Sequence, residues 1–270
     1  DMWPTTLVEV GGMSKYHPFV VAMQIGENSA YKHSDYVVSL LPNAEMYMHE
    51  HGLKAGHFKC IPNGIVWDEW EKPEELPAEH FQKLSELHKK DKFIVGYFGG
   101  HALSNNLDSI IDIAIKIEDP DIQFVLVGDG VEKNRLMSRV KDAGLENVVF
   151  LPPIHKKSIP RLCELFDCIY MGGKNSPLYR FGLCLNKMFD TMASGKPAIC
   201  AIGVPSYLTE YSCGYDVDND DIEKILSIIL HIKQLNNEQL EIIAQNGRDA
   251  IKERFNYAML AKEFTQLMEE

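Results

Sequence analysis

Residues 92–100, KFIVGYFGG, decide the fold of this chain. The run is short, almost entirely apolar and closed by two glycines, a pattern typical of a strand that is buried on both faces and followed by a tight turn. Helical spacing follows, with four apolar residues on one face: Leu107, Ile110, Ile111 and Ala114. Residues 123–130, QFVLVGDG, then repeat the strand and the glycine turn. We therefore predict a repeating strand–turn–helix unit.

The same unit recurs further along the chain. Apolar runs stand at 148–153 (VVFLPP), 168–173 (CIYMGG) and 197–202 (PAICAI), with amphipathic segments between them. Strands of this kind that alternate with helices predict a parallel sheet covered by helices on both faces. The predicted fold class is therefore α/β, with a Rossmann-like doubly wound parallel sheet that binds ligands at the carboxyl ends of its strands.

Residues 1–65 follow a different pattern. They contain a helical segment near 14–33 and two short strand-like runs, which is too little for a domain with a complete core of its own. We interpret them as the remnant, or tail, of a preceding α/β domain. The polar stretch 68–91 contains two prolines and is predicted to be a linker and a surface helix. The predicted division is a first domain over 1–75 and a second domain over 76–270.

Composition excludes several classes of function. The net charge of −12 argues against a nucleic-acid partner, because binding to a phosphate backbone needs a basic surface. No apolar run reaches the roughly 18 residues that span a bilayer. The six cysteines form no CxxC pair and lie mostly in apolar segments. We therefore expect a reducing cytoplasm, no disulfide bonds and no structural metal.

The candidate site lies in residues 179–197, YRFGLCLNKMFDTMASGKP. Helical spacing from Leu185 predicts a helix that begins near an Asn–Lys pair and carries Asp190 one turn in. Helix N-termini bind anions because their first N–H groups are unpaired, and a carboxylate accepts hydrogen bonds from ribose hydroxyls. The stretch therefore suits a ligand with phosphates and a ribose. The alternative is an ordinary buried helix on which Asp190 is a solvated charge.

Other motifs narrow the chemistry. The turn at Gly99 and Gly100 leads into HALSNN and lacks the third glycine of GxGxxG, which argues against a nicotinamide oxidoreductase. The sequence contains no GxxxxGK[ST], no GxSxG and no HExxH. Arg180 is the best candidate for pairing with a phosphate, because a guanidinium binds oxyanions through two parallel bonds, and Lys187 is the second.

Five segments occur in an order that resembles the family-4 glycosyltransferases of the GT-B type: IPNGIVWDEW, GYFGGHALSNNLDSIIDIA, FVLVGDGVEKNRL, VVFLPPIHKKSIPRLCELFD and YRFGLCLNKMFDTMASGKPAI. Within that family the chain is most similar to the fucosaminyltransferase-like branch of bacterial surface-polysaccharide enzymes. The resemblance implies a GT-B C-terminal domain and retaining transfer of a sugar from a nucleotide-diphosphate sugar, with UDP-sugars favoured, to a glycan or lipid-linked acceptor. It also implies no metal and no cofactor, and a cytoplasmic enzyme that is peripheral at the inner face of the membrane.

The resemblance also implies which residues bind the donor. They line the diphosphate and the sugar, face the base or hold the ribose: Gly99, Gly100, His101, Asn105, Gly130, Pro153, Ile154, Arg180, Phe181, Gly182, Asn186, Lys187 and Asp190. Two features depart from the family pattern. The first Glu of Glu-x7-Glu is absent, the region before Phe181 reading SPLYR, and HALSNN replaces the basic pair after the glycine turn. The catalytic residues therefore remain unassigned.

From the comparison with that family, we expect most of the acceptor domain to be absent from this chain. An alternative function is therefore a non-catalytic donor-binding fragment, or one subunit of a split glycosyltransferase. Its partner would be the missing N-terminal domain or a second copy of the chain. A more distant alternative is a GT-B-like epimerase or phosphorylase.

Overall fold

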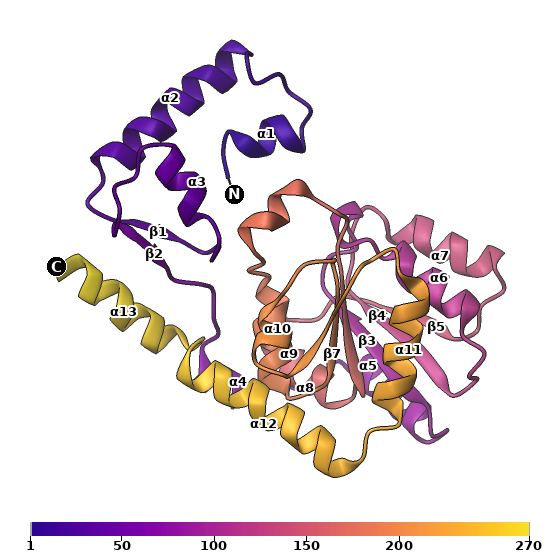
Figure 1. Ribbon diagram of the computed structural model, residues 1–270. Helices are drawn as coiled ribbons and strands as arrows, with labels where there is room; N and C mark the ends of the chain where they lie inside the picture. Colours follow the sequence, from indigo (N-terminus) through magenta and orange to yellow (C-terminus); the bar gives the residue numbers. More distant parts are fainter. Residues whose placement is uncertain (1, 270) are drawn as a thin grey trace. The chain divides into compact units, whose positions relative to one another are not determined.

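The computed structural model describes residues 2–269, and its contacts divide the chain into two compact units (Figure 1). The first comprises Asp1–Asn63, Asn175–Cys184 and Ala258–Glu270, and the second comprises Gly64–Lys174 and Leu185–Tyr257. The second unit thus begins ahead of the predicted boundary at residue 75. Two segments that the sequence analysis places in the second domain, 175–184 and 258–270, belong to the first unit. The acceptor and donor roles of the two parts stay predictions.

The second unit contains a six-stranded sheet in which every neighbouring pair of strands is parallel. Its strands are β3 (Phe93–Phe98), β4 (Ile122–Val127), β5 (Val148–Leu151), β6 (Cys168–Gly172), β7 (Ala198–Ala201) and β8 (Gly214–Val217). The order is β5-β4-β3-β6-β7-β8, so the winding reverses between β3 and β6. Open α/β sheets bind ligands at such a reversal. The predicted doubly wound α/β fold is confirmed.

Helices cover both faces of this sheet (Figure 1). They are α4 (Trp67–Trp70), α5 (Ala78–His88), α6 (Asp108–Lys116), α7 (Lys133–Asp142), α8 (Ile159–Glu164), α9 (Asn186–Ser194), α10 (Tyr207–Glu210), α11 (Ile222–Lys233) and α12 (Asn237–Glu253), with 3-10 turns η1 (Leu103–Asn105) and η2 (Lys156–Ser158). Val95 and Tyr97 of β3 pack in the core with α6, α7 and α11. Ile94 and Phe98 pack in the core with α5 and α8. Successive side chains of a strand point to opposite faces, so one apolar run supplies both cores.

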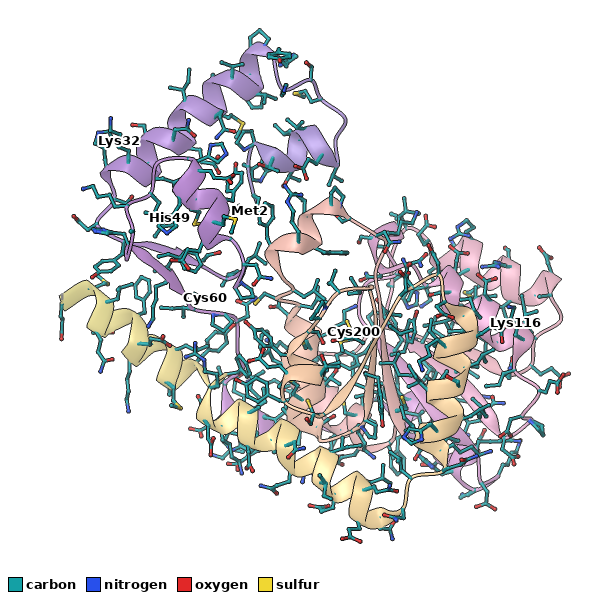
Figure 2. All side chains as sticks on the ribbon, in the orientation of Figure 1. Met2, Lys32, His49, Cys60, Lys116 and Cys200 are labelled. Atoms are coloured by element: carbon teal, nitrogen blue, oxygen red, sulfur yellow. The ribbon has the colours of Figure 1, made fainter. Side chains whose placement is uncertain are left out.

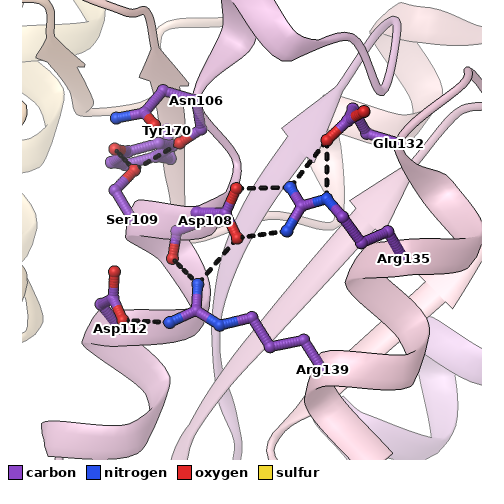
Figure 3. A network of polar contacts seen from close by, with 8 residues as sticks. All are labelled: Asn106, Asp108, Ser109, Asp112, Glu132, Arg135, Arg139 and Tyr170. Atoms are coloured by element: carbon purple, nitrogen blue, oxygen red, sulfur yellow. Dashed lines mark hydrogen bonds and ion pairs between the residues drawn. The ribbon is translucent and has the colours of Figure 1, made fainter.

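An ion-pair network joins α6 and α7 (Figure 3). Arg135 forms two parallel bonds with Asp108, one of 2.9 Å, and binds Glu132 at 2.7 Å. Arg139 binds Asp108 at 2.8 Å and also contacts Asp112. The guanidinium of Arg135 holds the pKa of Asp108 below its usual range. Isolated surface pairs contribute little to stability, whereas a network with parallel Arg–carboxylate bonds fixes geometry. It therefore fixes the helices that follow the two glycine turns.

The first unit contains a small parallel sheet of two strands, β1 (Val37–Ser39) and β2 (Phe58–Cys60). Its helices are α1 (Thr5–Glu9), α2 (Pro18–His33) and α3 (Glu45–Glu50), with the 3-10 turn η3 (Pro177–Phe181) and α13 (Tyr257–Glu269), of which residues from Ala258 belong to this unit. Phe181 packs in the same small core as Met2 and Met48. Lys59 forms an ion pair with Glu263 of α13 at 3.0 Å. These contacts explain why segments distant in sequence join this unit.

All six cysteines are free thiols, as expected. Cys200 lies on β7 inside the sheet, where burial raises the pKa of its thiol (Figure 2). No helix within residues 2–269 is long and apolar enough to cross a membrane.

We expect Gly96→Ala to destabilise the second unit strongly. A Cβ at this position of β3 would lie 2.1 Å from the ring of Phe166, and overpacking of a core costs about 1–3 kcal/mol. Urea denaturation followed by circular dichroism measures the loss. Adding Phe166→Leu to the Gly96→Ala chain removes the ring atoms that clash and should recover part of the lost stability. The Phe166→Leu single variant completes the double-mutant cycle. A loss below about 0.5 kcal/mol, the range of neutral surface changes, would contradict this account.

Candidate functional site

The glycine turns after β3 and β4 lie backbone against backbone. The N–H of Gly99 donates to the carbonyl of Val127 at 3.0 Å, and the N–H of His101 donates to that of Asp129 at 2.7 Å. A Cβ on Gly128 would lie 1.9 Å from the carbonyl oxygen of Gly99, and one on Gly130 would lie 2.4 Å from that of His101. Both glycines also have positive φ angles. The Gly-Asp-Gly turn is therefore needed for this close approach, whether or not Gly130 contacts a ligand.

A cavity of about 250 Å³ opens at the carboxyl ends of β3, β4 and β5. Its walls come from three chain segments and are largely apolar: Phe98, Gly99, Gly100, Val127, Gly128, Asp129, Pro153, Ile154 and Ile159. The structure thus brings together four predicted donor-binding residues, Gly99, Gly100, Pro153 and Ile154. Phe98, Val127 and Ile159 were not predicted to line a site, because each belongs to an apolar stretch that looks like ordinary core.

The ammonium of Lys187 lies beside the Gly99–Gly100 turn. Its Nζ donates to the hydroxyl of Tyr97 and to Oδ1 of Asn105, both at 3.2 Å. It also lies 4.5 Å from the centroid of the Tyr97 ring. Burial lowers the pKa of Lys187 to about 8. The structure therefore brings two predicted residues, Lys187 and Asn105, to the edge of the glycine turn.

The amino end of α9 has no side-chain cap. Its N-cap residue, Leu185, provides no side-chain hydrogen bond to the first N–H groups of the helix. Such groups bind anions, because they are unpaired and the positive end of the helix dipole is there. The N–H of Gly100 also finds no acceptor among residues 2–269. Asn186, the first helical residue, is exposed, as a ligand-facing position requires.

Asp190 is buried, not solvated. Only 7% of its surface is exposed, and no other residue within 2–269 forms a hydrogen bond or an ion pair with its carboxyl group. Burial raises the pKa of Asp190 to about 6, and Lys156 opposes the shift. The reading of Asp190 as a solvated surface charge is therefore wrong. Asn186 and Asp190 share one side of α9, but the second half of the helix enters the domain and is buried all round.

His101 lies in the interior, beside the cavity but not on its wall. Its side chain has no exposed surface and packs against the rings of Tyr97 and Phe150, each at 5.9 Å between centroids. Neither ring nitrogen has a hydrogen-bond partner among the described residues. Burial, together with the charge of Lys133, lowers the pKa of His101 to about 4. The imidazole is therefore neutral near pH 7 and supplies no positive charge to a ligand.

Arg180, Phe181 and Gly182 belong to the first unit, whereas the other predicted site residues belong to the second. The guanidinium of Arg180 binds both carboxylate oxygens of Glu9, one at 2.8 Å, and the carbonyl of Pro177 at 2.7 Å. It also lies over the ring of Phe181. This pairing raises the pKa of Arg180 and lowers that of Glu9. The role of Arg180 as a phosphate ligand stays a prediction.

Residues 79–250 match the model of one family, the glycosyl transferases group 1. The chain belongs to this family. Two curated relatives are a Bacillus subtilis protein named for a glycosyltransferase role in teichuronic acid biosynthesis and an Escherichia coli protein named for a glycosyl transferase role in colanic acid biosynthesis. The first is 28% identical over 54% of this chain and 35% of its own length. The second is 26% identical over 44% of this chain and 29% of its own length. The matches thus span about a third of these relatives.

Solved structures confirm the fold. The Anabaena protein HepE, crystallised in complex with UDP-glucose, has a TM-score of 0.73 with this chain. The two are 18% identical, and the match covers 97% of this chain and 70% of HepE. At this identity the likeness is one of fold alone. It agrees with the expected GT-B class, while the fucosaminyltransferase-like branch stays a prediction.

We expect Asp190→Asn to stabilise the chain at pH 7–8. The folded-state pKa of Asp190 lies above the value of an exposed Asp, so its ionisation opposes folding once the pH rises through about 6. Replacing it by a neutral amide should raise the free energy of unfolding at pH 8 by up to roughly 3 kcal/mol, because the raised pKa of Asp190 lies about two units above its usual value and each unit corresponds to about 1.4 kcal/mol. The gain should shrink at pH 5, which urea titrations at both pH values would measure. Equal gains at the two pH values would show that ionisation is not the cause.

Proposed function

We propose that this chain binds the nucleotide-diphosphate sugar of a retaining glycosyltransferase, with a UDP-sugar as the favoured donor. The observation that supports it most directly is the position of the Lys187 ammonium. It lies beside the Gly99–Gly100 turn, at the uncapped amino end of α9. Helix N-termini, free N–H groups and ammonium groups are complementary to a diphosphate. Family membership is consistent with this use of the site.

The cavity and the helix suit different parts of such a donor. Apolar walls at Phe98, Val127 and Ile159 suit the flat faces of a base, and the main chain at Pro153 and Ile154 is available to its edge. We favour UDP over GDP as the nucleotide of the donor. In HepE the bound donor is also a uridine nucleotide. The role of Asp190 as a ribose ligand stays a prediction, because its side chain is buried and does not line the cavity.

The proposed chemistry needs no metal at the diphosphate. As the bond to the sugar breaks, negative charge grows on the diphosphate oxygens, and preorganised donors stabilise such charge most where water is excluded. Lys187, the Gly100 N–H and the first turn of α9 are the donors available here. We propose that the acceptor is a glycan or a lipid-linked sugar of a surface polysaccharide, as the names of the curated relatives suggest, and that the protein works in the cytoplasm at the inner face of the membrane. Retention of configuration and transfer of a hexose or an N-acetylamino sugar belong to the same proposal.

A second candidate function is donor binding without transfer, by one part of a split enzyme. The small β1–β2 sheet and the exposed apolar side chains of α2, Phe19, Val21 and Ile25, favour it. Exposed apolar surface of this kind marks an interaction site. Transfer from a UDP-sugar to a lipid-linked glycan by the purified chain alone, in a monomeric state, would exclude this alternative.

We expect the chain to bind UDP by calorimetry and to lose affinity when Lys187 is replaced by Met. A hydrogen bond to a charged group contributes about 1.5–3 kcal/mol, so the loss should be roughly ten- to a hundredfold. The matched control is Lys116→Met, because Lys116 lies at the end of α6 and, within residues 2–269, pairs only with the exposed Glu223. GDP should bind more weakly than UDP. Absence of binding of either nucleotide at millimolar concentration would refute the proposed function.

The pH dependence of this binding follows from the pKa of Lys187. The ammonium form attracts the diphosphate, and burial has already lowered its pKa to about 8. Affinity for UDP should therefore fall as the pH rises through about 8. Lys187→Met should abolish that fall. A pH profile that is identical in the wild-type chain and in Lys187→Met would exclude Lys187 as the titrating group.

A further inference from the structure

Tyr97 lies beneath the Gly99–Gly100 turn, where its hydroxyl contacts two of the proposed diphosphate-binding elements. The side chain is 1% exposed and belongs to β3. Its hydroxyl donates to the carbonyl of Gly100 at 2.7 Å and accepts from Lys187 Nζ at 3.2 Å. Its ring faces the same ammonium at 4.5 Å. One buried side chain thus links the turn to the cation.

Asn105 completes the arrangement from η1. Its Nδ2 donates to the carbonyl of Gly100 at 2.8 Å, and its Oδ1 accepts from Lys187 at 3.2 Å. The carbonyl of Gly100 therefore has two donors directed at it, and the ammonium has two neutral acceptors. No carboxylate among residues 2–269 forms an ion pair with Lys187. Because neutral groups hold the ammonium, its positive charge is left for an incoming anion.

We propose that Tyr97 is a positioning residue for the donor: its hydroxyl fixes the Lys187 ammonium against the Gly99–Gly100 turn, where the diphosphate binds. A free lysine side chain loses rotamer entropy when it is ordered. Holding it in place before the ligand arrives removes that cost from binding. The inference rests on the proposed function, since it concerns how the same site binds its nucleotide.

The pKa of Lys187 can be used to detect its contact with the Tyr97 hydroxyl, because the other titratable groups around it do not change charge near pH 8. The titratable groups that face it are Tyr97 from β3, Cys200 from β7 and His101 from the glycine turn. Burial raises the pKa of Tyr97 and of Cys200, and it lowers that of His101, so all three are neutral near pH 8. Of these four residues, Lys187 is therefore the one whose charge changes near pH 8. Removing the Tyr97 hydroxyl takes away an acceptor of the charged form and should lower the pKa of Lys187 further.

The test compares Tyr97→Phe with Tyr170→Phe. Tyr170 is also a fully buried tyrosine, on the neighbouring strand β6, but its hydroxyl bonds to Ser109 and not to Lys187. UDP affinity is measured by calorimetry from pH 6 to pH 10 for both variants and for the wild-type chain. We expect Tyr97→Phe to bind UDP about five- to tenfold more weakly at pH 7, the equivalent of one hydrogen bond. Its loss of affinity should also begin at lower pH, whereas Tyr170→Phe should match the wild type in both respects.

A second measurement needs no ligand. The reactivity of Lys187 toward acetic anhydride, followed by mass spectrometry across the same pH range, reports the pKa of its amine in each variant. Tyr97→Phe should shift that pKa downward, and Tyr170→Phe should leave it in place. Unchanged UDP affinity and unchanged Lys187 reactivity in Tyr97→Phe would overturn the positioning role while leaving the proposed function intact. If the wild-type chain binds no nucleotide, both the positioning role of Tyr97 and the proposed function are refuted.

Discussion

The candidate site depends on one steric constraint, the contact between the backbones of two turns. The loop after β4 can press against the loop after β3 only because Gly128 and Gly130 have no side chains. That contact places the carbonyls of Val127 and Asp129 as acceptors for Gly99 and His101, and so extends the β3–β4 pairing beyond the end of the strands. The same contact encloses His101 and leaves Gly100 facing outward. The ion pairs between α6 and α7 reinforce it, because each helix begins a few residues after one of the two turns.

The site also contains two ionisable side chains that are largely buried. Lys187 and Asp190 lie three residues apart on α9, and desolvation disfavours the charged form of each. Neither residue is neutralised by the other or by another ion pair within the described chain. Proteins keep such groups where a ligand supplies the missing interactions, and perturbed pKa values concentrate at functional sites for that reason. Desolvation of these two groups therefore reduces the stability of the chain at the pH values where they are charged.

The sequence predicted the fold well, because long apolar strands and amphipathic helices have distinct periods. Five strands and the glycine turns were found by this means, whereas β8 was missed, since GYDV is a half-buried edge strand with no apolar run. The site was predicted in part. Gly99, Gly100, Asn105 and Lys187 come together, but the cavity walls and Tyr97 have no sequence signal that separates them from core. The burial of Asp190 escaped prediction because helical spacing shows which residues share a side, not how deeply a helix enters the domain. The segment 175–184 precedes the site helix directly, yet belongs to the other unit, and only tertiary contacts reveal this.

The division into units has a consequence for biosynthesis. The chain passes from one unit to the other four times, after Asn63, Lys174, Cys184 and Tyr257. A ribosome releases the polypeptide from its amino end, and domains usually fold in that order. Here the first unit needs α13, whose Glu263 binds Lys59, before its contacts are complete. Its contacts therefore form fully only after the residues of the second unit have also left the ribosome.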